Sequence, residues 1–208
     1  AFVSGGGSNL RAIAAHDGFE EVGEVALVVA SNASCGGAEW ARERGIDVVV
    51  WPGKAGTPSS EPAVLLSALE SRDVDLVVLA GYLKLVPEAV VRAYERRMLN
   101  VHPALLPAFG GAGMYGGRVH AAVVASGARF SGPTVHFVTA EYDEGPIVAQ
   151  RAVPVLSGDT PESLAARVLR AEHWLYPRVV SAACAGGVRW GADGVPRVAA
   201  LEAGADDE

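Results

Sequence analysis

Asn100 and His102 have the residue types and the spacing that catalysis on a carbonyl group would need. Apolar residues before them predict a strand over 98–101, and residues two apart point to the same face of a strand. An amide donor beside an imidazolium can stabilise a carbonyl oxygen as it gains negative charge. A capping asparagine beside a buried, hydrogen-bonded histidine is the alternative, and for this pair taken alone it is the favoured one.

Asp143 changes that balance, because it lies in a turn-like segment between two expected strands. A carboxylate beside His102 would raise the pKa of the imidazole and keep it protonated near neutral pH. The preceding segment 110–117 is too rich in glycine to be core, so it predicts a loop near the same site. Asn100, His102 and Asp143 therefore form a candidate catalytic trio.

The other histidines fit plainer roles. His136 lies in the middle of an expected strand, which indicates a structural residue or one that supports the trio. His16 and His120 are interpreted as surface residues of helices.

A glycine-rich loop, Ser4–Leu10, joins the end of a first strand to the start of a helix. Glycine lets the backbone approach a ligand closely, and unpaired N–H groups at a helix start favour phosphate. Ser8 or Asn9 is the expected helix cap. The loop lacks the lysine of a nucleotide P-loop, and Ser31-Asn32 replaces the acidic residue of a dinucleotide site. A phosphate monoester is the ligand that fits best.

The apolar pattern predicts an α/β fold. Strands at 2–3, 25–30, 46–50, 74–80 and 98–101 alternate with helical segments, which indicates a mostly parallel sheet with helices on both faces. A longer strand at 131–139 and another at 146–155 are expected to pair antiparallel, before a helix at 162–182, a weak hairpin and an acidic tail. We expect a single domain, 1–208, with parts at 1–100, 101–185 and 186–208.

Composition excludes several functional classes. The 208 residues carry a net charge of −7 with a pI near 5.3, which argues against nucleic-acid binding but not against small anionic substrates. Cys35 and Cys184 follow no metal or redox spacing, and no apolar run is long enough to cross a bilayer. These features predict a cytoplasmic protein with no metal and no membrane partner. Composition leaves the assembly open between a monomer and a homodimer.

Several segments together resemble the glycinamide ribonucleotide formyltransferase family of folate-dependent enzymes. They are SGGGSNL at 4–10, LAGY at 79–82, NVHP at 100–103, LLP at 105–107, TVHFV at 134–138 and DEGP at 143–146. They occur in that family's order and close to its spacing, over nearly the whole chain. The NVHP segment is shared by the wider formyltransferase superfamily, and the serine-glycine loop narrows the resemblance to this branch.

The resemblance implies a Rossmann-like formyltransferase fold, 10-formyltetrahydrofolate as donor and 5′-phosphoribosylglycinamide as acceptor in purine biosynthesis. It assigns catalysis to Asn100, His102 and Asp143. Acceptor binding is implied for Gly7, Ser8, Asn9 and Glu172, and folate binding for Leu83, Lys84, Leu85, Val86, Asn100, Ala140, Glu141, Tyr142 and Asp143.

The chain also departs from the family pattern. Leu169 stands where the family often has lysine or glutamine, with Arg170 as the neighbouring candidate replacement. An arginine common before the fourth strand has no counterpart between Ser59 and Leu69, and segment 110–117 differs from the commoner Pro-Gly-x-His form.

Other functions stay open at this point. The nearest is a formyltetrahydrofolate deformylase or another folate formyltransferase. The chain is short and acidic for the tRNA enzyme, which normally has a second, basic domain. A phosphosugar-binding module without catalysis comes next, and a nicotinamide oxidoreductase is disfavoured by Ser31-Asn32.

Overall fold

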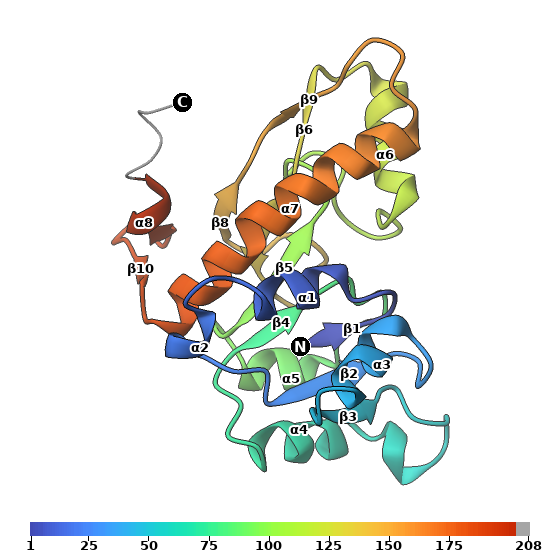
Figure 1. Cartoon of the computed structure of the whole chain (residues 1–208), viewed down its shortest axis with the longest axis vertical. Helices are drawn as coiled ribbons and strands as arrows, with labels where there is room; N and C mark the ends of the chain where they lie inside the picture. The colour runs from blue at the N-terminus through green and yellow to red at the C-terminus, as the bar shows by residue number, and fades with distance from the viewer. Residues whose placement is uncertain (203–208) are drawn as a thin grey trace.

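A computed structural model describes residues 1–202 of the chain, and it has a seven-stranded sheet at its centre (Figure 1). The strand order is β3-β2-β1-β4-β5-β7-β8; the first five pair in parallel, and β7 and β8 pair antiparallel. The strands are β1 Phe2–Val3, β2 Leu27–Ala30, β3 Asp47–Val50, β4 Val77–Leu79, β5 Met98–His102, β7 Thr134–Phe137 and β8 Ile147–Gln150. The predicted α/β class and mostly parallel sheet are confirmed.

Helices cover both faces of this sheet. The helices are α1 Ser8–Ala14, α2 Phe19–Val22, α3 Gly36–Arg42, α4 Pro62–Glu70, α5 Glu88–Ala93, α6 Gly117–Ser126, α7 Pro161–Cys184 and α8 Ala199–Glu202, with a short 3-10 turn at Pro58–Ser60. Buried residues of α1, α3 and α7 form one core with the sheet, and those of α4 and α5 form the other. Both faces are therefore apolar, as parallel strands require.

The longest helix, α7, ties the second half of the chain to the sheet (Figure 1). It begins with a capping box in which Thr160 and Ser163 satisfy each other's backbone N–H groups. Its Tyr176, which is fully buried, donates its hydroxyl to the carbonyls of Leu79 and Leu99. Because these carbonyls lie on β4 and β5, α7 is fixed across the two strands that end at the site.

The predicted strand at 131–139 is confirmed over Thr134–Phe137, and its antiparallel pairing with the strand at 146–155 is confirmed by the β7–β8 ladder. Its predicted start is wrong, because the chain joins the main sheet only after Gly132. Two short strands, β6 Phe130–Ser131 and β9 Val153–Pro154, pair with each other in a separate ribbon. Gly132 has φ +140, and a Cβ there would collide with the carbonyl of Arg151. The same ribbon divides the predicted strand 146–155 into β8 and β9.

The C-terminal prediction is confirmed in part. β10 Val188–Trp190 and β11 Pro196–Val198 form the antiparallel hairpin, and α8 follows it. The acidic tail at 203–208 lies outside the described residues. No helix within residues 1–202 is long and apolar enough to span a membrane.

Candidate active site

A cavity of about 920 Å³ opens where β4 and β5 end, the edge at which sheets of this type bind ligands. It brings together most of the residues expected from the sequence: Asn9, Leu83, Lys84, Leu85, Val86, Asn100, His102, Ala140, Glu141, Tyr142, Asp143 and Glu172. Gly7 and Ser8 do not line it. The strand ends and the loops after them therefore supply the chemistry, and helices α1 and α7 contribute Asn9 and Glu172 to the lining.

Asn100 and His102 lie side by side because both belong to β5 and alternate with its core residues. Leu99 and Val101 point into the core that contains α7, so Asn100 and His102 face the other way. The antiparallel neighbour β7 places His136 opposite Asn100 in the ladder. The expected pairing of an amide and an imidazole on one strand face is present.

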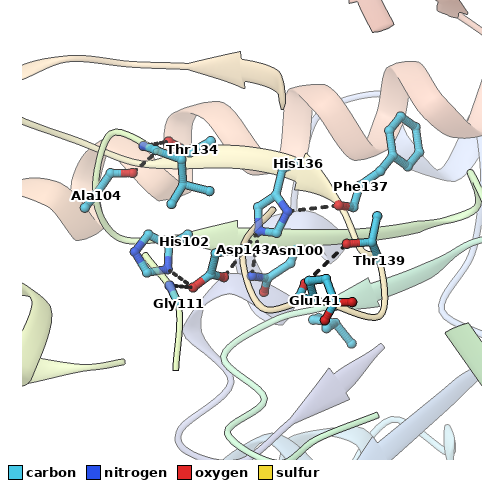
Figure 2. Close-up of polar contacts among 12 residues, drawn as sticks. Asn100, His102, Ala104, Gly111, Thr134, His136, Phe137, Thr139, Glu141 and Asp143 are labelled. Atoms are coloured by element: carbon cyan, nitrogen blue, oxygen red, sulfur yellow. Dashed lines mark hydrogen bonds and ion pairs between the residues drawn. The ribbon is translucent and has the colours of Figure 1, made fainter. Parts of the chain in front are cut away.

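Asp143 reaches His102 from the loop between β7 and β8, in a left-handed backbone conformation with φ 57 (Figure 2). Its Oδ2 lies 3.4 Å from His102 Nδ1 and accepts the Gly111 N–H at 2.9 Å. On the far side of the ring, His102 Nε2 donates to the Phe109 carbonyl at 2.8 Å. A doubly protonated imidazolium satisfies both acceptors, whereas a neutral imidazole can donate to one.

His136 supports Asn100 directly. Its Nδ1 donates to the Phe137 carbonyl at 2.9 Å, and burial lowers its pKa, so the neutral ring is favoured. The unprotonated Nε2 then accepts a hydrogen bond from Asn100 Nδ2 at 3.0 Å. This contact, drawn in Figure 2, uses one N–H of the amide, and the second N–H of Nδ2 remains to donate to another acceptor.

Asn9 and Glu172 form a second polar contact on the helix side of the cavity. Asn9 Nδ2 donates to Glu172 Oε2 at 2.7 Å, and burial raises the pKa of Glu172. Asn9 Oδ1 is buried without a hydrogen-bond partner, so an acceptor remains here for a ligand's hydroxyl or amine.

The predicted cap of α1 by Ser8 or Asn9 is wrong. Gly7 is the capping residue, in a left-handed conformation with φ 72 and no side-chain hydrogen bond. A Cβ at Gly7 would lie 2.7 Å from Gly37 Cα, so the loop packs directly on the start of α3. The close approach requires glycine, and it leaves the Asn9 side chain free to meet Glu172.

The surface interpretation of His120 and His16 is also corrected. His120 is buried on α6, lines the cavity, and has an unpartnered Nδ1 and a pKa lowered by burial. The signal was its position three residues before the buried Val123, on the same helix face. His16 is half-buried in the turn after α1.

Tyr115 is a cavity residue that sequence reasoning left unassigned. It lies within segment 110–117, whose glycine content predicts a loop but does not indicate what the loop faces. Within residues 1–202, no group of three or more histidine, cysteine, aspartate or glutamate side chains is arranged to hold a metal ion.

An amide, an imidazole and a carboxylate at the carboxyl edge of a Rossmann-like sheet define a formyltransferase class of site. Residues 1–180 match the family model described as formyl transferase, and the chain belongs to that family. A folate-type formyl donor follows from the family.

The chain is similar to named enzymes along most of its length. It is 54% identical to the chloroplastic phosphoribosylglycinamide formyltransferase of Arabidopsis thaliana, over 95% of this chain and 68% of that one. The Escherichia coli phosphoribosylglycinamide formyltransferase is 36% identical, over 92% and 85%. The crystal structure of glycinamide ribonucleotide transformylase 1 from Symbiobacterium toebii matches with a TM-score of 0.83 and 40% identity, over 95% and 91%.

The predicted cytoplasmic location is contradicted. The relatives from Arabidopsis thaliana, Vigna unguiculata and Glycine max are all named chloroplastic, which points to a plastid. The chain spans about two thirds of the length of these relatives. Composition and fold could not reveal this, because an organelle address is read by a receptor and leaves no mark on a packed domain.

Proposed function

We propose that the protein transfers the formyl group of 10-formyltetrahydrofolate to the amine of 5′-phosphoribosylglycinamide, which yields formylglycinamide ribonucleotide and tetrahydrofolate in purine biosynthesis. The observation that carries the proposal is the trio Asn100, His102 and Asp143, assembled in a cavity large enough for two substrates. The names of relatives that cover nearly the whole chain support the same reaction.

The geometry supports a direct transfer. The acceptor's amine nitrogen attacks the formyl carbon, and the carbonyl oxygen becomes an oxyanion. The free N–H of Asn100 donates to this oxygen, and the His102 imidazolium lies beside it as a positive charge. Asp143 Oδ2 is occupied by His102 and Gly111, whereas Oδ1 lies 3.6 Å from His136 Nε2, which donates no proton to it while that ring is neutral. Oδ1 is therefore the oxygen assigned to accept the amine's proton through water. The bond to the folate nitrogen breaks, and that nitrogen takes up a proton.

The acceptor is assigned to the helix side of the cavity. Gly7, Ser8 and Asn9 would hold its phosphate and ribose, and Glu172 its hydroxyls, with the open acceptor on Asn9 as support. The donor is assigned to segments 83–86 and 140–143, which line the same cavity. In this division 1–100 holds the acceptor's phosphate, 101–185 is catalytic and donor-binding together with Asn100 and segment 83–86, and 186–208 is peripheral. The proposed assembly is a monomer or homodimer.

Product release with and without acceptor tests the proposal. Purified protein is mixed with 10-formyltetrahydrofolate, and formation of tetrahydrofolate is followed by absorbance. Turnover that requires phosphoribosylglycinamide is the expected result. Turnover with water alone would establish a deformylase, and acceptor binding without any turnover would leave a phosphosugar-binding module.

A further inference from the structure

The glycine-rich segment 110–117 begins against the catalytic carboxylate. The Gly111 N–H donates to Asp143 Oδ2 at 2.9 Å. A Cβ at Gly110 would lie 3.2 Å from Asp143 Cβ, so the backbone packs closely against that residue. The start of the segment is therefore held at the trio. Tyr115 follows four residues after Gly111, which limits its backbone to about 14 Å from the trio.

Tyr115 lines the cavity but is not part of a core. Its side chain is 47% exposed, and the guanidinium of Arg118 lies over its ring at 5.0 Å from the centroid. Gly113 and Gly116 flank it at φ 86 and φ 54, left-handed conformations that glycine adopts readily because it has no Cβ. One face of the ring is thus covered by a cation, while about half of the side chain stays exposed in a residue that lines the cavity.

The surroundings of Tyr115 indicate an apolar ligand. Leu83, Leu85 and Tyr142, from two other segments, line the same cavity and are 59%, 61% and 53% exposed. Exposed large apolar side chains that cluster in one cavity indicate a binding surface, whereas single ones scattered over a protein surface do not. These apolar residues share the cavity with the polar trio, and Tyr142 directly precedes Asp143 in the chain.

We propose that Tyr115 binds the aminobenzoyl ring of the formyl donor, an inference that rests on the proposed function. In that donor the formyl group is bonded to the nitrogen that the aminobenzoyl ring carries. If the trio holds the formyl group, the ring lies within two bonds of it and enters the part of the cavity nearest the start of segment 110–117. Tyr115 stacks on the ring, and Arg118 on the opposite face of Tyr115 holds the tyrosine in place.

Direct binding measurements on Tyr115→Ala test this inference without requiring turnover. The dissociation constant for 10-formyltetrahydrofolate is measured anaerobically by equilibrium dialysis, in the absence of acceptor. We expect it to rise roughly tenfold, as loss of an aromatic contact implies. Tyr115→Phe keeps the ring and should stay within twofold of the wild type. Phe130→Ala is the matched control, because Phe130 is 62% exposed and lies outside the cavity residues.

Fragments of the donor locate the contact. Aminobenzoylglutamate and a simple pterin are compared as competitors against the intact donor. Tyr115→Ala should weaken competition by aminobenzoylglutamate and leave competition by the pterin unchanged. An unchanged donor affinity, a loss confined to the pterin, or a rise in the acceptor's KM alone would overturn the inference.

The two proposals fail differently. A wild-type protein that binds the donor but transfers nothing contradicts the proposed function and leaves the Tyr115 measurement intact. A wild-type protein that transfers the formyl group, with a Tyr115→Ala variant of unchanged donor affinity, contradicts only the role of Tyr115.

Discussion

Two groups of cavity residues are built on different principles: the buried polar residues around His102 and His136, which form the polar end, and the exposed apolar residues of the loops, which form the apolar end. At the polar end His102 and His136 are 3% and 2% exposed, and neighbouring groups hold both nitrogens of each ring. At the apolar end Leu83 and Leu85 are 59% and 61% exposed, on loops rather than strands. The difference indicates that the groups assigned to the reaction are held in place before substrate binds. The groups assigned to donor binding gain much of their packing from the bound donor itself.

The cause lies in the backbone beneath each end. Asn100 and His102 are part of β5, and the ladder to β7 fixes their distance from His136. Preorganised donors are worth most when they need no rearrangement during the reaction. Loops tolerate the exchange of side chains better, which suits a surface that must accept and release a large ligand. Variants at the polar end should therefore alter kcat, and variants at the apolar end should alter donor binding.

Asn100→Ala tests the polar end with the largest expected effect. Loss of one oxyanion donor should lower kcat about 100- to 1,000-fold, because that donor acts mainly in the transition state. Steady-state kinetics with both substrates measure it, and the KM for the acceptor should change little. A variant within a few-fold of the wild type would reject the role of Asn100 and remove the distinction between the two ends.

His136→Gln tests whether Asn100 depends on its neighbour. Glutamine loses the fixed ring acceptor that turns the Asn100 amide, so we expect kcat to fall about tenfold, the value of one neutral hydrogen bond. The double variant with Asn100→Ala should be no slower than Asn100→Ala alone, because the two residues act through one contact. Additive losses in that cycle would show that His136 acts on its own.

Glu172→Gln sharpens the comparison by changing a polar group that is proposed to bind the acceptor and to take no part in the reaction. Glutamine can still accept from Asn9 but lacks the charge for the acceptor's hydroxyls. We expect the KM for phosphoribosylglycinamide to rise about tenfold, the difference between a charged and a neutral hydrogen bond. The KM for the donor should not move. A fall in kcat with both KM values unchanged would place Glu172 among the reacting groups instead.

The sequence predicted the polar end better than the apolar end, and the reason is physical. Strand periodicity alone places Asn100 and His102 on one face, and the position of Asp143 between two strands brings it to the same edge. Residues in a glycine-rich loop have no such period, so nothing in segment 110–117 indicated that Tyr115 lines the cavity. The direction of a side chain can be predicted from sequence where it belongs to a strand or helix, because the regular backbone of these elements determines that direction.

The errors in the fold have the same origin. Alternation continues through 131–139, yet Gly132 makes a close approach to Arg151 that bends the chain out of the sheet. That contact joins residues distant in sequence, and a local pattern does not contain it. The prediction for His120 was wrong for a different reason. Polar residues are usually exposed, and the helix sequence does not show that the buried His120 lies beside a cavity.

The smallest predicted effect is on stability, again at Glu172, and its sign follows from burial. Burial raises the pKa of this carboxyl above its usual 4.5, so the folded protein holds the proton more tightly than the unfolded chain does. The free energy of unfolding therefore falls as pH rises through the raised pKa, and Glu172→Gln removes that loss. We expect the Tm of the variant to exceed that of the wild type by about 2–4 °C at pH 8, and to match it near pH 4.

Scanning calorimetry across this pH range measures the difference. Glu39→Gln, on the exposed side of α3, is the control that should show no pH-dependent gain in Tm. A variant less stable than the wild type at pH 8 would mean that Asn9 and the cavity already compensate the buried charge, which would make this contact part of the fold's stability as well as of the proposed acceptor site.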